Sequence, residues 1–318
     1  MRVVIADPYL GDVAFEQSRA GDRSTVSQAS LETPDEVRRG TSDADAVIVT
    51  THTMAAAHID ALGPRVRIIG RAGIGLDSID LEAARRRGIA VFHTPDYCVS
   101  EVADQTVMAM LALARCLPDQ ERIARTPGWA GRGELRFSPF DELTVGVVGA
   151  GRIGQAVLAR LAAFGSTRIV FDPFVSDLPS EVVREADLDR LLGRSDIVSL
   201  HCPLTSETRG LLSAERIRLM KPGAYLVNVA RAQLVDEAAL LEALWAGRLG
   251  GAVLDVFPAE PIPEGSPLLN APRVILTPHY AWHSTTAEIR TRRQTLDGVL
   301  AYLEGSMPAD GRMAVLPL

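Results

Sequence analysis

Short apolar runs rich in valine and isoleucine recur along the chain, and between them apolar residues return at the spacing of helices. This alternation is typical of βαβ units, in which helices cover a parallel sheet and its strands read as continuous apolar runs. The sequence therefore predicts the α/β class. Strands are expected at residues 3–6, 46–50, 66–70 and 90–93, and in a second series at 145–148, 168–171, 197–201, 225–229, 252–255 and 274–277.

The pattern changes near Pro95, where a long helix is predicted to start with Ser100 as its N-cap and to run to about residue 115. This change indicates a domain boundary. Residues 126–143, which place Trp129 among prolines, glycines and arginines, are expected to form an extended arm that touches a partner subunit. Further helices are predicted at 152–164, 188–193, 214–220, 237–246 and 286–304.

Composition narrows the class of protein. The chain has 318 residues, of which 47% are apolar, and this is enough for two domains with separate cores. A net charge of −7 without a long basic run argues against nucleic acid as a partner. No apolar run approaches the roughly 18 to 20 residues of a membrane span, and no signal peptide is recognisable, so no membrane partner is expected.

The cysteines and histidines argue against a metal or disulfide framework. Cys98, Cys116 and Cys202 are odd in number and widely spaced, which favours a reducing, cytoplasmic location. No pair among His52, His58, His93 and His201 has the spacing of metal ligands, so no metal site is expected.

The strongest motif is TVGVVGAGRIGQAV, in which Gly149, Gly151 and Gly154 form a GxGxxG pattern between a strand and a helix. The first glycine permits a tight turn, the second lets a pyrophosphate approach the backbone, and the third lets helix and strand pack closely. Asp172 ends the next predicted strand, where an acid accepts hydrogen bonds from an adenosine ribose and repels a 2′-phosphate. The motif therefore predicts NAD as the cofactor.

Three polar residues follow predicted strands on the edge that carries the glycine motif. They are Arg231, Glu260 and His279. Ligands of doubly wound folds bind at the carboxyl ends of the strands. An arginine for a carboxylate, a histidine for a proton and a glutamate to orient the histidine make a complementary set, which predicts a catalytic site.

Over nearly its whole length, the chain resembles the D-isomer-specific 2-hydroxyacid dehydrogenase family. The motifs that carry the resemblance are GRAGIGLDSID (70–80), VVGAGRIGQAV (147–157), LHCPLTSETRGLL (200–212), MKPGAYLVNVARAQLVDEAAL (220–240), GAVLDVFPAEP (251–261) and TPHYAW (277–282). The text around Asp172 and Trp282 is most similar to the C-terminal-binding-protein branch, whereas residues 70–89 are similar to phosphoglycerate dehydrogenases. The motifs therefore do not decide which of these two branches of the family the chain is closer to.

The resemblance implies two doubly wound Rossmann-like domains with parallel sheets. The NAD domain, residues 99–284, would be inserted into a discontinuous, flavodoxin-like substrate-binding domain formed by residues 1–98 and 285–318, with the active site in the cleft between them. His279 would be the proton donor and acceptor, Glu260 would orient it, and Arg231 would hold the substrate carboxylate.

Further roles come only from the resemblance. Expected cofactor contacts, besides the three glycines and Asp172, are Thr106, Arg152, Ile153, Cys202, Pro203, Thr208, Ala230 and Asp255. Expected substrate contacts are backbone amides of Ile74 and Gly75, with Arg71 as an anion hook or else a structural ion pair, and Trp282 as a pocket wall or else a core anchor. Ala232 and Tyr280 stand where the family usually has smaller residues, and both are expected to narrow the pocket.

The resulting hypothesis is a cytoplasmic, homodimeric, NAD-dependent D-2-hydroxyacid dehydrogenase that reduces a 2-keto acid to a D-2-hydroxy acid. One alternative is a phosphoglycerate dehydrogenase-like enzyme, or a reductase of a 2-keto acid bearing a phosphate or phosphonate. The alternative from another class is an NAD-sensing, corepressor-like interaction protein, against which the intact set of Arg231, Glu260 and His279 argues.

Overall fold

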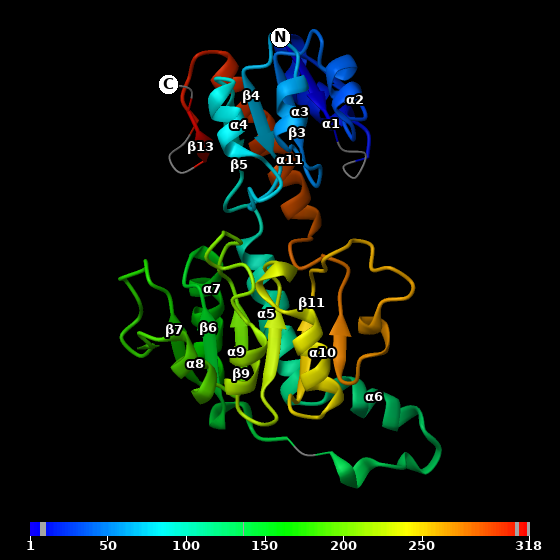
Figure 1. Cartoon of the computed structure of the whole chain (residues 1–318), viewed down its shortest axis with the longest axis vertical. Coiled ribbons are helices and arrows are strands. Elements are labelled where there is room, and N and C mark those ends of the chain that lie inside the picture. Colours follow the sequence, from blue (N-terminus) through cyan, green and yellow to red (C-terminus); the bar gives the residue numbers. More distant parts are fainter. Residues whose placement is uncertain (7–10, 136, 309–311, 317–318) are drawn as a thin grey trace. The chain divides into compact units, whose positions relative to one another are not determined.

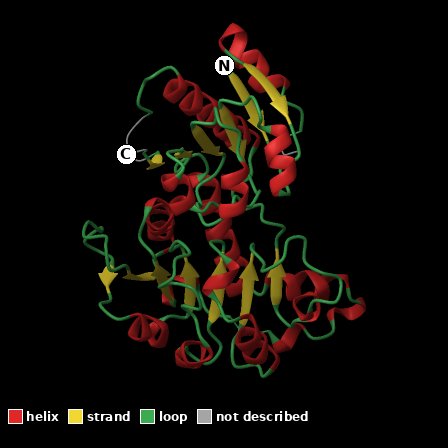
Figure 2. Cartoon of the chain, turned by 45° about the horizontal axis from the view of Figure 1, so that its top comes forward, coloured by secondary structure: helices red, strands yellow, loops and turns green. Residues whose placement is uncertain are grey.

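The computed structural model describes residues 1–6, 11–135, 137–308 and 312–316. The chain forms two compact α/β units (Figures 1 and 2). Unit 1 consists of Met1–Tyr97 and Ser284–Leu318, and unit 2 of Cys98–His283. The boundaries expected from the sequence lie one residue further along the chain at both junctions.

Unit 1 is built on a six-stranded sheet with the order β13-β5-β4-β3-β1-β2. Five strands are parallel, and β13 pairs antiparallel with β5. The strands are β1 (Arg2–Ile5), β2 (Thr25–Gln28), β3 (Ala46–Val49), β4 (Ile68–Arg71), β5 (Ala90–His93) and β13 (Met313–Val315). The helices are α1 (Ala14–Ala20), α2 (Pro34–Gly40), α3 (Ala56–Ala61), α4 (Leu81–Arg86) and α11 (Thr285–Leu303).

Helix α11 completes the core of unit 1 from the far end of the chain. Its Leu296, Val299 and Leu300 are fully buried in one cluster with Val3 and Ile5. The contact with the sheet is close, because a Cβ on Gly70 would lie 2.6 Å from Val299 Cγ2, and one on Gly298 would lie 2.3 Å from the Phe92 ring. Two glycines therefore allow this helix to pack directly on β4 and β5.

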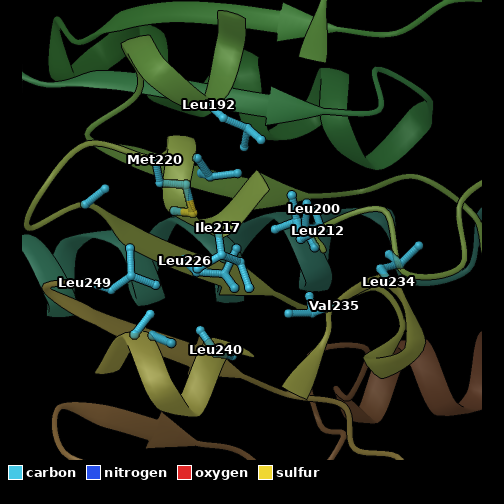
Figure 3. Packing of buried hydrophobic residues seen from close by; sticks show 14 of the residues in the cluster. Leu192, Leu200, Leu212, Ile217, Met220, Leu226, Leu234, Val235, Leu240 and Leu249 are labelled. Atoms are coloured by element: carbon cyan, nitrogen blue, oxygen red, sulfur yellow. The ribbon is translucent and has the colours of Figure 1, made fainter. Parts of the chain in front are cut away.

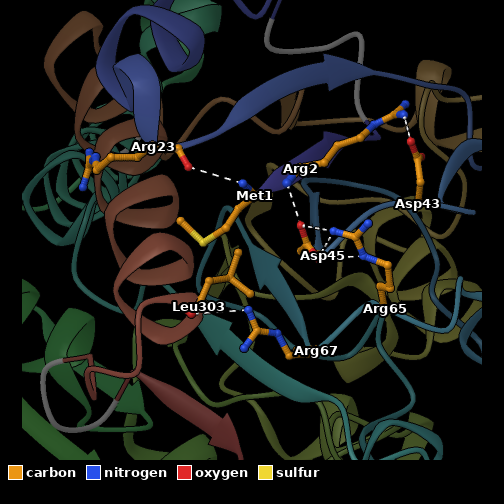
Figure 4. Close-up of polar contacts among 8 residues, drawn as sticks. All are labelled: Met1, Arg2, Arg23, Asp43, Asp45, Arg65, Arg67 and Leu303. Carbon is orange, nitrogen blue, oxygen red and sulfur yellow. Dashed lines mark hydrogen bonds and ion pairs between the residues drawn. The ribbon is translucent and has the colours of Figure 1, made fainter.

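Polar contacts close the amino-terminal edge of the same sheet (Figure 4). Asp45, next to the start of β3, accepts a hydrogen bond from the backbone N–H of Arg2 at 2.8 Å and one from Arg65 Nη2 at 2.7 Å. Arg2 also pairs with Asp43 through its guanidinium. The Asp45 carboxylate thus joins three segments of unit 1.

Unit 2 contains a fully parallel seven-stranded sheet with the order β12-β11-β10-β9-β6-β7-β8. The strands are β6 (Thr144–Val148), β7 (Thr167–Phe171), β8 (Val183–Arg184), β9 (Ile197–Leu200), β10 (Tyr225–Asn228), β11 (Gly251–Leu254) and β12 (Val274–Leu276). The helices are α5 (Val99–Ala114), α6 (Leu117–Arg125), α7 (Arg152–Leu161), α8 (Leu188–Arg194), α9 (Ala214–Leu219) and α10 (Glu237–Trp245). Leucines such as Leu192, Leu226 and Leu240 pack in its core (Figure 3).

Every predicted strand is present within one or two residues at each end. The predictions missed the short strands β2, β8 and β13 and the helices α1, α2, α3, α4 and α6. Residues 126–143 include 3₁₀ turns at Pro127–Trp129 and Phe140–Glu142 in the part of the segment that the structure describes.

The prediction that Ser100 caps the long helix is wrong. The N-cap of α5 is Cys98, and Ser100 lies inside the helix. Its hydroxyl accepts a hydrogen bond from Arg160 Nη2 at 2.8 Å, so it joins α5 to α7 instead. Asp236 is the N-cap of α10, because its carboxylate accepts a hydrogen bond from the N–H of Ala239.

Candidate active site

The strand order of unit 2 brings the candidate residues to one edge. From β6 the chain runs outward through β7 and β8 and then returns to β9 on the other side of β6. Such a reversal is the topological switch point at which doubly wound folds bind ligands. Since all seven strands are parallel, the residues that follow them share the carboxyl edge of the sheet.

The glycine loop joins β6 to α7. Gly149 has a φ of +95°, and a Cβ there would lie 2.6 Å from the backbone nitrogen of Cys202. A Cβ on Gly154 would lie 2.1 Å from the carbonyl oxygen of Gly149. Around Gly151, in contrast, a Cβ would meet nothing within 4 Å, and no side chain caps the N-terminus of α7. The loop thus leaves open space beside the N–H groups of a helix start, as a pyrophosphate requires.

Asp172 follows β7 and reaches back to this loop. Its carboxylate accepts hydrogen bonds from the N–H groups of Ala150 at 2.7 Å, Phe174 at 2.8 Å and Val175 at 3.0 Å. Burial acts to raise the pKa of Asp172, but these three bonds and the charge of Arg184 outweigh it and bring the pKa below its ordinary value. An ionised acceptor therefore lies beside the glycine loop at neutral pH.

His279 and Glu260 form the hydrogen-bonded pair that the sequence predicts. His279 Nδ1 lies 2.7 Å from Glu260 Oε2, and both side chains are partly exposed. Glu260 Oε1 accepts from the N–H of Phe257 at 2.9 Å. Burial acts to raise the pKa of Glu260, yet the bonds from His279 and Phe257 and the charges of His279 and Arg231 bring it below its ordinary value. Because Glu260 is ionised, the Nδ1–H group donates and Nε2 is the ring atom that can exchange a proton with a ligand.

Arg231 follows β10 and lies close enough to Glu260 for its charge to act on that carboxylate. The loop that carries it is held by Asn228, a buried residue that the sequence reasoning missed. The Asn228 amide donates to the carbonyl of Arg231 at 2.8 Å and accepts from the N–H of Ala230 at 3.1 Å. The polar residue at the end of an apolar strand was the signal that could have identified it.

Asp255 supports the turn that presents His279. It is fully buried and accepts hydrogen bonds from the Thr277 hydroxyl at 2.5 Å and from the N–H groups of Tyr280 and Ala281 at 3.0 Å each. His279 itself has a φ of +55°, a strained conformation for a residue with a side chain. Asp255 therefore holds the Thr277 side chain before His279 and the backbone of Tyr280 and Ala281 after it. The cofactor contact that the resemblance implies for Asp255 stays a prediction.

The other predicted cofactor residues differ in accessibility. Arg152 and Pro203 are exposed, whereas Thr106 is fully buried and its hydroxyl donates to the carbonyl of Val102. The Thr208 hydroxyl closes a loop by donating to the carbonyl of Pro203 at 2.7 Å. Ile153, Cys202 and Ala230 are partly buried. Burial and the charge of Asp172 raise the pKa of the Cys202 thiol to about 11. Cys202 is therefore an uncharged, poorly nucleophilic wall beside the glycine loop.

The predicted substrate residues of unit 1 follow β4. The Arg71 guanidinium donates to the carbonyl of Ala72 at 2.7 Å, and a Cβ on Gly73 would lie 2.2 Å from its Nη1. In the described part of the chain, the amides of Ile74 and Gly75 donate no hydrogen bond. These two N–H groups are thus available to an anion. In unit 2, Trp282 lies edge-on to His283, with 5.2 Å between the ring centroids.

Metal clusters and membrane-spanning helices are both absent among the described residues. No group of three or more His, Cys, Asp and Glu side chains there is arranged to hold a metal ion. Nor does any helix in these ranges have both the length and the apolar composition to cross a membrane.

Comparison with known proteins identifies the family to which the chain belongs. Residues 107–281 match the model described as "D-isomer specific 2-hydroxyacid dehydrogenase, NAD binding domain". The chain is 39% identical to a glyoxylate reductase of Thermofilum pendens over 284 residues, which cover 86% of this chain and 83% of the relative. It is 36% identical to the D-3-phosphoglycerate dehydrogenase of Mycobacterium tuberculosis over 292 residues, 91% of this chain and 55% of the relative. The chain thus spans about half the length of the phosphoglycerate dehydrogenases that it matches.

A solved structure of an enzyme with a similar fold matches the whole chain. A D-lactate dehydrogenase from Aquifex aeolicus, complexed with NAD and lactic acid, aligns with a TM-score of 0.90 at 30% identity and full coverage of both chains.

Proposed function

Because the chain belongs to the D-isomer-specific 2-hydroxyacid dehydrogenase family, we propose that it is an NAD-dependent enzyme that reduces a 2-keto acid to a D-2-hydroxy acid. The observation that carries the proposal is the His279–Glu260 hydrogen bond of 2.7 Å, on the sheet edge that also presents Arg231 and the glycine loop. Together these residues provide a proton, an anion contact and a nucleotide site.

The cofactor is NAD, and the residues of unit 2 fit it. The open space at Gly151 and the uncapped start of α7 suit the pyrophosphate, and the ionised Asp172 suits a ribose without a 2′-phosphate. Bound NADH supplies the hydride to the keto carbon. The chain's own residues orient the substrate and move the proton.

His279 is the proposed proton donor. In its doubly protonated form, with Nδ1–H held by Glu260, the imidazolium gives the Nε2 proton to the keto oxygen and takes one back in the oxidative direction. Arg231 binds the substrate carboxylate through its planar fork, and its charge favours negative charge developing on the keto oxygen. The open amides of Ile74 and Gly75 are proposed to bind the same carboxylate, and Trp282 the substrate side chain.

Two further properties belong to the proposal. We infer a homodimer, since the segment 126–143 exposes Trp129 and Phe137, with 56% and 42% of their surface accessible. Exposed apolar side chains that gather on one segment are typical of a surface that a partner covers. A cytoplasmic location is supported by three cysteines that all remain free.

The test follows NADH absorbance with a panel of 2-keto acids, comparing the wild type with His279→Ala. General acid catalysis contributes about 10²- to 10⁴-fold in rate, so kcat should fall by that factor while NADH affinity is unchanged. His58→Ala is the matched control, because His58 lies in unit 1 on α3 and bonds the carbonyl of Glu32. Undiminished turnover by His279→Ala would exclude the proton donor. NADH binding without turnover of any keto acid would favour the interaction-protein alternative.

A phosphate-bearing keto acid is the second candidate substrate. It is favoured by the position of Arg71, whose guanidinium occupies the space that a side chain at 73 would fill, next to the open amides of Ile74 and Gly75. Arg71→Gln should raise KM about tenfold or more for a keto acid with a distal phosphate, and much less for pyruvate. An equal change in KM for both substrates would assign Arg71 a structural role.

A further inference from the structure

A cavity of about 200 Å³ lies in unit 2 at the amino-terminal edge of the sheet, the edge opposite the glycine loop. Its floor is apolar and comes from the end of α5 and from β12, through Ala112, Leu113, Val274 and Ile275. Pro118, Asp119 and Arg122 of α6 form one wall. A cavity of about 150 Å³ already accommodates benzene, so this one has room for a single aromatic ring with a substituent.

Polar groups gather on the other wall of the cavity. The Tyr225 hydroxyl is in hydrogen-bond contact with the Cys116 thiol, and the charge of Arg273 acts on the same hydroxyl. Gly250 makes room for this arrangement, because a Cβ there would lie 2.7 Å from Cε1 of the Tyr225 ring. Cys116 and Arg273 have φ values of +49° and +57°, so both polar residues are held in strained backbone conformations.

The charge around the cavity is unbalanced. Arg122 pairs with Asp119 at 3.2 Å on α6. Arg273 donates to the carbonyl of Leu249 at 3.2 Å, and among the described residues no carboxylate forms an ion pair with it. A guanidinium with most of its donors uncommitted, beside a phenol and an apolar floor, suits a planar carboxylate with an apolar body.

We propose that this cavity binds a small organic carboxylate of about the size of benzoate. The carboxylate contacts Arg273 and Tyr225, and the apolar body lies on Ala112, Leu113 and Ile275. The cavity adjoins the start of β10 and of β12, whereas Arg231 and His279 follow the ends of those strands. Binding there is therefore independent of the nucleotide.

The experiment is calorimetric titration with benzoate, made in the Arg231→Gln chain because a carboxylate would otherwise also bind at Arg231. Saturable binding is expected, with a Kd that NADH leaves unchanged. Adding Arg273→Gln should weaken binding at least about tenfold, and neutral benzamide should bind the Arg231→Gln chain more weakly by a similar factor. Ala112→Leu, which fills the floor, should also weaken binding. Arg218→Gln, an exposed arginine outside the cavity, is the matched control and should change nothing.

The absence of saturable benzoate binding would overturn the proposal, and so would an affinity that both Arg273→Gln and Ala112→Leu leave unchanged. An affinity that falls as protein concentration rises would also overturn it, because a second copy of the chain would then cover the cavity. Circular dichroism of each variant separates lost binding from lost folding. Arg273→Gln changes an exposed residue, so it keeps the test valid if Ala112→Leu does not fold.

Discussion

Asp45 of unit 1 and Asp255 of unit 2 are both buried carboxylates next to a parallel strand, but they lie at opposite ends of their strands and have opposite partners. Asp45, just before β3, is paired with Arg65 and the N–H of Arg2. Asp255, just after β11, accepts only from uncharged donors, namely a hydroxyl and two N–H groups. The first arrangement joins segments of a sheet, and the second fixes a turn that carries His279.

The pKa values of the two carboxyls differ accordingly. Burial acts to raise both. For Asp45, the hydrogen bonds from Arg2 and Arg65 outweigh it and the pKa is below the ordinary value. For Asp255, the bonds from Thr277, Ala281 and Tyr280 and the charge of His279 are not sufficient, and the pKa is above the ordinary value. Asp45, which a cation holds in its ionised form, acts as a structural anchor, whereas the raised pKa of the buried Asp255 is the kind of shift that gathers at functional sites.

The largest expected effect is on catalysis. Asp255→Ala should lower kcat about 100-fold, because the turn around His279 loses three hydrogen bonds and small misplacements of a catalytic group are that costly. Asp255→Asn retains an acceptor oxygen and should restore part of the rate. Steady-state kinetics, with NADH affinity measured separately by fluorescence, distinguishes this loss from general destabilisation.

Asp45→Ala is the counterpart and should leave kcat within about twofold while lowering the free energy of unfolding by about 1–3 kcal/mol. A kcat loss for Asp45→Ala as large as that for Asp255→Ala would break the comparison.

A smaller effect concerns stability against pH. The contribution of Asp45 is present above its unfolded pKa and is lost as pH falls through its lowered folded value. The contribution of Asp255 to the free energy of unfolding depends on pH in the opposite way. It is present below the unfolded pKa and is lost as pH rises through the raised pKa of the folded state. The difference in urea midpoint between the wild type and Asp45→Asn should therefore change with pH, from about pH 3 to 7, in the opposite direction to the difference between the wild type and Asp255→Asn. Parallel slopes would contradict the assignment.

The smallest effect is spectroscopic. His201, after β9 on the same edge as Asp255, also favours its uncharged form, because burial lowers its pKa to about 4. Its ring protons should titrate near pH 4 in NMR spectra, identified by their absence in His201→Gln. As pH falls below about 6.5, this histidine takes up a proton in the unfolded chain but not in the folded one, so acid lowers the stability of the wild type. The free energy of unfolding should therefore fall less steeply with decreasing pH in His201→Gln than in the wild type. A midpoint near 6.5 would show that the ring is hydrated.

The sequence predicted what depends on local patterns. Apolar runs located ten strands, and the GxGxxG spacing located the loop in which Gly149 and Gly154 leave no room for a Cβ. Strand β8 was missed because its two residues are both exposed and have no apolar pattern. Strand β13 was missed because it pairs with β5 from more than 200 residues away. The tasks of Asn228 and Asp255 depend on which N–H groups a folded turn presents, and residue order alone does not encode this.

The composite origin of unit 1 sets an order of events during synthesis. The ribosome releases β1 to β5 first, yet the apolar surface of this sheet that α11 covers has no partner until residues 285–303 are made. Unit 2, encoded as one uninterrupted segment, can acquire its native packing in the meantime. The nascent segment from β1 to β5 must therefore avoid aggregation while unit 2 folds, and the core of unit 1 is completed only after residues 285–303 have been made.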